Sequence, residues 1–341
     1  MNIKKIVHNL KRLRLNANQY KQRKLICLEY PTRVWVEPTN ICNLKCDICP
    51  NQEISRKKQK QGFMDFGLYK KVIDQVSEFA LDINLFDRGE PLLHQELPSM
   101  ITYAKEKGLR VRLETNATLL TPGLSKEIIS AGLDFISFSF DGLTKEVYEQ
   151  TRRGAKYDET LSNIKLFLKE KGEAKTPYTL LQIIKTPQLK KNSFSSAGFK
   201  AFKNEFFGLS LDGFRVITPH RFSGTIAVDK TGIEYGYMDN PKKLVYMPCP
   251  YPWFTLTVLY DGTVVPCCMN FFKDYCLGDI NKDRLVDIWN SEPMVSLRNN
   301  LANQSQDIVM CKGCDLLYQK KMAGVSIKNL RDVLTLIREL G

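Results

Sequence analysis

Three cysteines stand within eight residues of one another in the stretch NICNLKCDICP, residues 40–50. Their spacing is Cys42-x3-Cys46-x2-Cys49, and they directly follow an apolar, strand-like run, RVWVEP. Because three is an odd number, internal disulfides cannot use all of these thiols. In a reducing compartment, closely spaced cysteines indicate metal or redox chemistry. The loop therefore predicts a bound inorganic group at the end of the first strand.

The composition predicts a soluble globular protein of the cytoplasm. The chain has 341 residues, of which 43% are hydrophobic, enough for one large domain or two modest ones. It has no run of about 18 uncharged apolar residues. Its first residues lack the apolar stretch and cleavage site of a secretory signal. The presence of ten cysteines at uneven spacing therefore indicates metal or redox chemistry and not a disulfide framework.

The net charge of +13 favours acidic partners. Residues 1–30 carry eight Lys or Arg and one acid, Glu29, and apolar residues recur there at helical spacing. This pattern predicts a basic amphipathic helix. The helix either packs on the domain with a solvated basic face or contacts a membrane surface or an acidic partner. A nucleic-acid partner is disfavoured, because basic and aromatic residues are not interleaved.

The chain from residue 33 onward predicts an α/β fold. Six strand-like runs alternate with helical patterns: RVWVEP, DINLFDRGE, RVRLETN, DFISFSFDG, YTLLQIIKT and DGFRVIT. Right-handed crossovers would wind them into a partial (β/α)6 TIM-like barrel, with its reactive groups at the C-terminal strand ends. After Pro219 the alternation stops, and Asp261-Gly262 predicts a hairpin turn. We expect an N-terminal helix (1–30), the barrel (31–225), a cysteine-bearing domain (245–318) and a C-terminal helix (319–341).

Three thiolates leave one iron of a 4Fe–4S cluster open to another ligand. The segment EPTNICNLKCDICP resembles the signature of the radical S-adenosylmethionine (radical SAM) enzymes, whose cluster chelates SAM through its methionine group. A zinc site is the alternative interpretation, but zinc in structural sites prefers four protein ligands.

The radical SAM resemblance extends to the later strand ends DRGEPLLH, ETNATLL, SFSFDG and TRRG. It implies that Gly89 lets the backbone approach SAM, that Glu90 holds the methionine amino group, and that Asn116 contacts the ribose. It also places Ser139 and Asp141 near SAM and offers Arg152 to the SAM carboxylate.

A second cysteine set comprises Cys249, Cys267, Cys311 and Cys314, and four thiols can close a site. Around it, CPYPWFTLTVLYDGTVVPCC, LGDI, DIWNSEP and CKGC resemble the SPASM auxiliary-cluster domain, in its shortened, one-cluster (twitch) form. The resemblance implies an auxiliary 4Fe–4S cluster and spans about residues 33–317. We expect Cys27 and Cys268 to be buried apolar residues, whereas Cys276 could replace one of the four ligands.

The segment RVITPHRFSG places Arg215, His220 and Arg221 around the end of the sixth strand. They either form a solvated basic loop, or they orient or deprotonate a substrate hydroxyl or bind a phosphate. The resemblance implies hydrogen abstraction by a 5′-deoxyadenosyl radical. A fully ligated auxiliary cluster would accept an electron, which favours dehydrogenation of a carbohydrate, cyclitol or nucleotide sugar. Epimerisation is the outcome if a hydrogen donor returns an atom to the substrate radical instead.

Two other functions stay open, modification of a ribosomally made peptide and a non-enzymatic zinc or nucleic-acid-binding role. An acidic reductant of the flavodoxin or ferredoxin type is the expected protein partner.

Overall fold

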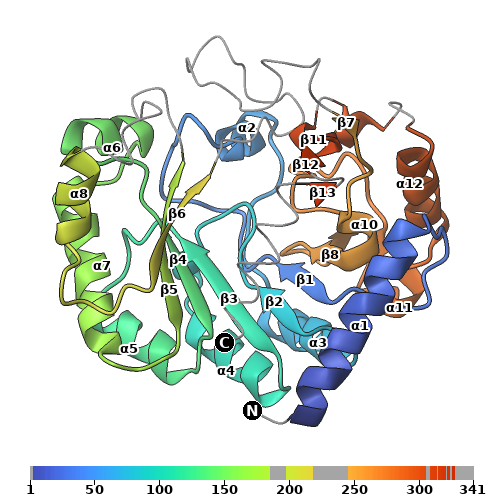
Figure 1. Ribbon diagram of the computed structural model, residues 1–341, viewed down its shortest axis with the longest axis horizontal. Coiled ribbons are helices and arrows are strands. Elements are labelled where there is room, and N and C mark those ends of the chain that lie inside the picture. Colours follow the sequence, from blue (N-terminus) through green and yellow to red (C-terminus); the bar gives the residue numbers. More distant parts are fainter. Residues whose placement is uncertain are drawn as a thin grey trace.

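The computed structural model describes residues 3–184, 197–217, 245–304, 308–312, 314–319, 321–322 and 325–326. Its main sheet has nine strands in the order β10-β9-β8-β1-β2-β3-β4-β5-β6 (Figure 1). Six consecutive strands of this sheet pair in parallel and confirm the six predicted strands. They are β1 (Arg33–Val36), β2 (Asp82–Asn84), β3 (Arg110–Thr115), β4 (Phe135–Ser139), β5 (Tyr178–Ile184) and β6 (Gly213–Ile217). The fold is the predicted open partial barrel.

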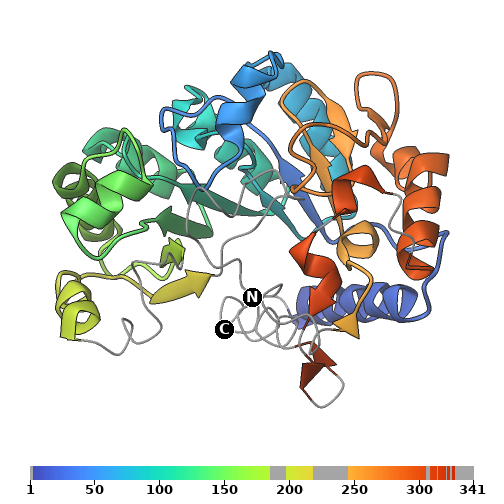
Figure 2. The same ribbon diagram turned by 90° about the horizontal axis from the view of Figure 1, so that it is seen from above.

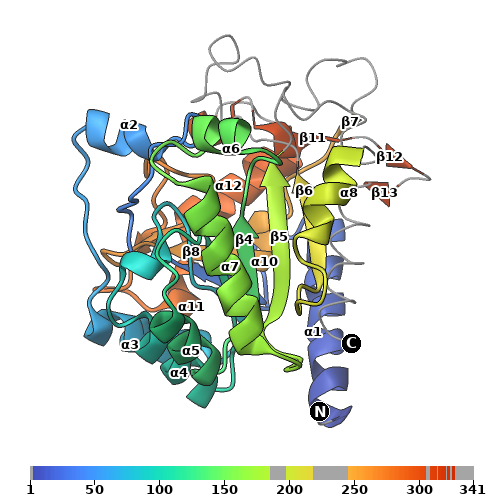
Figure 3. The same cartoon turned by 90° about the vertical axis from the view of Figure 1, so that its left-hand side faces the viewer.

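Helices cover the outer side of this curved sheet (Figures 2 and 3). Several begin at a side chain that caps them, such as Asp65, which accepts a hydrogen bond from the Leu68 amide, and Thr121, which accepts one from Leu124. The helices of the barrel are α2 (Asn51–Arg56), α3 (Phe66–Val76), the 3₁₀ turn η1 (Pro91–Leu93), α4 (Leu97–Glu106), α5 (Pro122–Ser130), α6 (Lys145–Thr151), α7 (Tyr157–Lys171) and α8 (Ala197–Asn204).

The two faces of the sheet differ in chemistry, because side chains alternate along each strand. The face toward the helices is a buried apolar layer, which includes Val34, Ile83, Val111, Leu113, Ile136, Phe138, Leu181 and Ile183. The opposite face, which we call the lumen face, is rich in polar groups. Register pairs Glu114 with Ser137, Ser139 with Gln182, and Gln182 with Arg215 on this face.

The cysteine-bearing segment extends the barrel sheet. It contains α10 (Tyr251–Phe254), β8 (Thr255–Val258), β9 (Thr263–Val265), β10 (Gly278–Asp279), α11 (Leu285–Ile288), α12 (Glu292–Ala302) and the 3₁₀ turns η3 (Val309–Cys311) and η4 (Asp315–Leu317). Strands β8 and β9 confirm the predicted hairpin, with Gly262 at φ +90°. Strand β8 runs parallel to β1, so this segment and the barrel share one sheet.

An N-terminal helix is present, α1 (Ile3–Lys21), but it ends nine residues before the predicted limit at residue 30. It packs against α10: the Tyr20 hydroxyl donates to the Pro248 carbonyl at 2.7 Å, and the Tyr20 and Trp253 rings lie 5.5 Å apart. This contact supports the interpretation that the helix packs on the domain. Among the described residues, no helix has the length and apolar character needed to cross a membrane.

Short strands occupy the described part of the C-terminal region. Strand β11 (Tyr318–Gln319) pairs with β7 (Val245–Tyr246), and β12 (Lys321–Met322) pairs with β13 (Val325–Ser326). The predicted C-terminal helix of residues 319–341 therefore does not begin at residue 319, because the chain first turns back on itself as strands. Residues 327–341 lie outside the described residues.

Candidate active site and cluster sites

The first cysteine loop leaves β1 and is held by amide side chains. Asn40 is fully buried; its Nδ2 donates to the Lys60 carbonyl and its Oδ1 accepts from the Gly62 amide, both at 3.0 Å. Asn51 Nδ2 donates to the carbonyls of Asn40 (3.0 Å) and Arg88 (2.6 Å). The cysteines therefore project from a backbone that is fixed from both sides.

The three thiols of this loop fit the three-ligand cluster site. Burial raises the pKa of Cys42 to about 12 and that of Cys49 to about 11, and neighbouring thiols add to both effects. Burial also raises the pKa of Cys46, against the opposing charge of Arg152. Such thiols stay protonated by themselves, and bound iron would displace the protons. Three mutually close thiols are the donor set that leaves one iron of a 4Fe–4S cluster open.

Gly89 packs directly against the backbone of the first cysteine loop. A Cβ on this residue would meet the carbonyl oxygen of Thr39, and that of Ile41 at 2.5 Å. The Glu90 amide donates to the same Ile41 carbonyl at 2.9 Å. The structure thus gives a reason for glycine that differs from the expected approach to SAM: the end of β2 must lie against the backbone of the loop.

The Glu90 carboxylate joins the ends of β2 and β3. It accepts hydrogen bonds from Thr115 Oγ1 (2.6 Å), the Asn116 amide (2.8 Å) and the Leu92 amide (3.1 Å). Burial raises the pKa of Glu90, and these hydrogen bonds oppose that rise. A carboxylate has about four acceptor positions, so one remains for an ammonium ligand.

Asn116 and Arg152 also contact the first cysteine loop. Asn116 Nδ2 donates to Asn43 Oδ1 at 3.0 Å. Arg152 Nε donates to Asp141 Oδ2 at 2.7 Å, and Asp141 Oδ1 accepts from the Ile184 amide at 2.6 Å. Burial by itself would lower the pKa of Arg152, but Asp141 and Cys46 raise it. Arg152 therefore lies between an acid and a cluster thiol, and its charge is already compensated.

Glu114 is a candidate site residue that the sequence analysis did not include. It lies on the lumen face of β3, where Gln182 hydrogen-bonds its carboxylate and Arg215 and Arg112 lie within electrostatic reach. Burial nevertheless raises the pKa of Glu114. The alternation in RVRLET, with Val111 and Leu113 apolar, was the signal that could have placed Glu114 in the lumen.

Three buried polar atoms on the lumen face have no hydrogen-bond partner within the part of the chain that the structure describes. They are Asn84 Oδ1, Ser137 Oγ and Thr257 Oγ1. Register places Asn84 and Thr257 on either side of Trp35, and Ser137 beside Glu114. Buried polar groups are normally hydrogen-bonded, so this face suits a ligand rich in hydroxyl or amide groups.

The second cysteine set meets at one place. Cys249 precedes α10, Cys267 follows β9, and Cys311 and Cys314 lie around η3. Burial raises the pKa of Cys249 well above its usual value, and Cys267, Cys314 and Cys311 add to this effect. Four converging thiols fit a fully ligated cluster.

The remaining cysteines and histidines divide between core and surface. Cys27 is buried, as expected. Cys268 was also expected to be buried but is only partly so, because it lies in the loop directly after Cys267. Cys276 is exposed. His94 Nε2 lies 2.9 Å from the Met64 carbonyl, so this ring makes a contact within the protein core. His220 and Arg221 lie outside the described residues. No group of three or more His, Cys, Asp or Glu among the described residues is arranged to hold a single metal ion.

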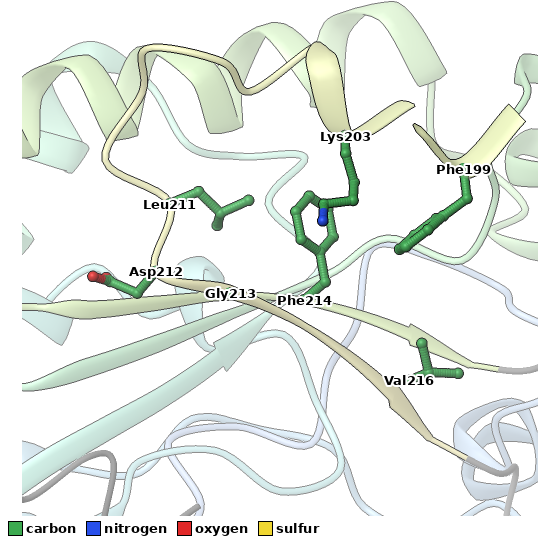
Figure 4. Close-up of a pocket in the computed structure, with 7 residues that line it drawn as sticks. All are labelled: Phe199, Lys203, Leu211, Asp212, Gly213, Phe214 and Val216. Carbon is green, nitrogen blue, oxygen red and sulfur yellow. The ribbon is translucent and has the colours of Figure 1, made fainter. Parts of the chain in front are cut away.

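A hollow of about 500 Å³ lies between α8 and β6 (Figure 4), lined by Phe199, Lys203, Leu211, Asp212, Gly213, Phe214 and Val216. Phe214 and Val216 point to the face of β6 opposite to Arg215, because side chains alternate along a strand. This hollow is therefore separate from the lumen face.

Two family models match the chain. That of the radical SAM superfamily matches residues 36–184, and that of SPASM, an iron–sulfur cluster-binding domain, matches residues 249–315. Together they include both cysteine sets and the first five strand ends. This chain carries a radical SAM domain followed by a SPASM domain. Its cofactors are SAM and 4Fe–4S clusters.

The tungsten-containing aldehyde ferredoxin oxidoreductase cofactor-modifying protein of Pyrococcus furiosus is 25% identical over 327 residues, 83% of this chain and 89% of the relative. BtrN, solved in complex with AdoMet and 2-DOIA, shares 20% identity over 84% of this chain and 94% of BtrN, with a TM-score of 0.55. Streptococcus suis SuiB, solved with its precursor peptide SuiA, shares 13% identity over 84% of this chain and 70% of SuiB, with a TM-score of 0.62. These solved structures share the fold.

Proposed function

We propose that this radical SAM protein dehydrogenates, or epimerises, a hydroxylated small molecule bound against the lumen face. A carbohydrate, a cyclitol or a nucleotide sugar would suit the site. The observation that carries the proposal is the polar lumen face, where Glu114, Gln182 and Arg215 lie beside polar atoms that lack partners among the described residues. An apolar substrate would add a cost of about 1–3 kcal/mol for each polar group of this face that it left buried without a hydrogen bond.

The proposed ligands of the SAM-binding cluster are Cys42, Cys46 and Cys49, and those of the auxiliary cluster are Cys249, Cys267, Cys311 and Cys314. When bound, SAM and the first cluster supply a 5′-deoxyadenosyl radical, and the auxiliary cluster supplies a one-electron acceptor. Glu90 would bind the SAM ammonium at its remaining acceptor position. Asn116, Ser139 and the Asp141–Arg152 pair would surround SAM at the strand ends.

The substrate would be held by residues of β3, β5 and β6. Glu114 would accept a hydrogen bond from a substrate hydroxyl, in addition to the hydrogen bond that its carboxylate receives from Gln182. Arg215 would donate to a substrate oxygen or phosphate. His220 and Arg221, beyond the described end of β6, remain proposed partners in this role.

Peptide modification is the second candidate. One observation favours it, namely the TM-score of 0.62 with SuiB, which was solved with a precursor peptide. A sheet that stays open between β6 and β10 would admit an extended chain as well as a small molecule.

A substrate screen tests the proposal and separates the two candidates. Cyclitols, sugars, nucleotide sugars and short peptides are incubated with reconstituted protein, SAM and dithionite, and substrate-dependent 5′-deoxyadenosine is measured. We expect release above background with hydroxylated small molecules and a carbonyl product lacking solvent deuterium when the assay is run in deuterated water. Deuterium at a product carbon would indicate epimerisation instead. Stimulation by peptides alone would overturn the small-molecule proposal.

The matched variant for this screen is Cys311→Ala with Cys314→Ala. We expect it to retain SAM cleavage but to lose the carbonyl product, provided that circular dichroism shows a retained fold. Normal carbonyl formation in a folded variant that lacks the auxiliary cluster would exclude that cluster as the electron acceptor.

A further inference from the structure

Two consecutive phenylalanines of the SPASM domain pack against the first cysteine loop. Phe271 and Phe272 form a small buried cluster with Ile54 of α2, and Cys49 packs against it. The two rings lie 5.9 Å apart at 67°, and their exposed fractions are 5% and 8%. A residue pair that lies more than 200 positions along the chain from Cys49 thus covers one side of the proposed cluster site.

Residues of the barrel fix this pair in place. Arg88 NH1 donates to the Phe271 carbonyl at 3.1 Å, and Gln59 Nε2 donates to the Phe272 carbonyl at 2.9 Å. The Lys57 ammonium lies 3.8 Å from the centroid of the Phe272 ring, within the range of a cation–π contact. Arg88 itself is held by a buried ion pair with Glu37.

The loop has no aromatic residue of its own for this purpose. Between Cys46 and Cys49 the chain has only Asp47 and Ile48, and Ile48 is a buried aliphatic residue. Of the three thiols, Cys49 packs against the cluster that Phe271 and Phe272 form with Ile54.

We propose that Phe271 and Phe272 form a shield that excludes water and oxygen from the Cys49 side of the SAM-binding cluster. The proposal rests on Cys42, Cys46 and Cys49 being the ligands of that cluster. The apolar shell around an iron–sulfur site controls solvent access and local dielectric, and hence the reduction potential. A cluster with three thiolates gains negative charge on reduction, and a dry surrounding disfavours that charge. Opening the shield should therefore raise the potential and speed oxidative loss.

The test compares Phe272→Ala, which opens the shield, with Phe272→Leu, which keeps an apolar cover. Phe206→Ala is the matched control, because Phe206 is also buried (4% exposed) but packs against Phe202 and Phe214 near α8 and β6. Each protein is reconstituted anaerobically, and its iron content and thermal unfolding are recorded. Aliquots taken during exposure to air are reduced again with dithionite, and the cluster that remains is measured through the EPR signal that changes on addition of SAM. The same signal is followed in an anaerobic redox titration.

We expect Phe272→Ala to lose this signal about tenfold faster than wild type, the lower end of what outer-shell changes cost a metal site. Its midpoint potential should rise, while Phe272→Leu and Phe206→Ala stay near wild type. Equal decay rates and potentials in wild type and Phe272→Ala would overturn the shield, as would equally fast decay in Phe206→Ala. If Phe272→Ala does not fold, Phe272→Gln replaces it, with the same expectations. A wild-type protein without any SAM-responsive signal would refute the ligand assignment itself.

Discussion

The Glu90 carboxylate receives hydrogen bonds from Thr115 Oγ1 and from the amides of Asn116 and Leu92. Glu90→Gln keeps the size of the side chain but removes the charge that would bind the SAM ammonium. Because hydrogen bonds to charged groups contribute about 1.5–3 kcal/mol, we expect SAM affinity to fall roughly 10- to 100-fold. Equilibrium binding of SAM to the reconstituted variant measures this. Unchanged affinity with full iron content would mean that Glu90 only ties β2 to β3.

Glu114 predicts a pH dependence of stability. Burial raises its pKa in the folded state above that of the unfolded chain, so between these values the folded state binds more protons and stability falls as the pH rises. Glu114→Gln should therefore melt at or above the wild-type temperature at pH 7 and should show a smaller gain in stability on acidification. Melting curves from pH 5 to 8, with the exposed Glu106→Gln as control, test this. A strongly destabilised Glu114→Gln at pH 7 would contradict it.

Above single residues, the Glu37–Arg88 pair connects four chain segments. Arg88 Nε and NH2 each lie 2.6 Å from a Glu37 oxygen, and both side chains are 0% exposed. Glu37 also accepts from the Tyr260 amide, and Arg88 donates to the Phe271 carbonyl. The pair therefore joins the ends of β1 and β2 to the SPASM domain on both sides of β9.

Removing one partner of this pair leaves a buried, uncompensated charge. We expect Arg88→Met to destabilise the protein by about 3–5 kcal/mol, and the double variant with Glu37→Met to recover part of that loss. Breaking the exposed Lys145–Asp158 ion pair should lower the free energy of unfolding by less than about 1 kcal/mol. Denaturant unfolding of anaerobic samples gives these differences. A double variant no more stable than Arg88→Met would argue against charge compensation.

The elements of the barrel were predictable from sequence, because each of the six strands has an apolar run bounded by turns. The hairpin of β8 and β9 was predictable from its own turn residues, Asp261-Gly262. Strand β8 joining β1 was not, since nothing in TLTV specifies which edge it pairs with. The close approach of the loop backbone to Gly89 was not predictable either, because Thr39 and Ile41 are 48 to 50 residues earlier in the chain. The contact of Phe272 with the cysteine loop depends on the same long-range docking.

At the scale of the whole molecule, two basic regions lie on different parts of the protein. Helix α1 packs on α10, whereas Lys45, Lys57, Lys58 and Lys60 are exposed around the first cysteine loop. If an acidic flavodoxin or ferredoxin delivers the electron, it should dock at the second region. Lys45→Glu with Lys58→Glu should then slow flavodoxin-driven SAM cleavage and reduce its salt dependence between roughly 0.05 and 0.3 M. Lys11→Glu with Arg14→Glu on α1 should change neither the rate of flavodoxin-driven SAM cleavage nor its salt dependence. Equal effects of both pairs would contradict site-specific docking.

Iron and sulfide content, measured together with SAM cleavage, tests the two-cluster account most directly. Anaerobically reconstituted protein should be brown and carry about eight iron and eight sulfide per chain, as two 4Fe–4S clusters require. Replacing Cys42, Cys46 and Cys49 together by Ala should leave about half of this iron and abolish conversion of SAM to 5′-deoxyadenosine under dithionite. Colourless wild-type protein that holds zinc, or a triple variant that still cleaves SAM, would contradict the account.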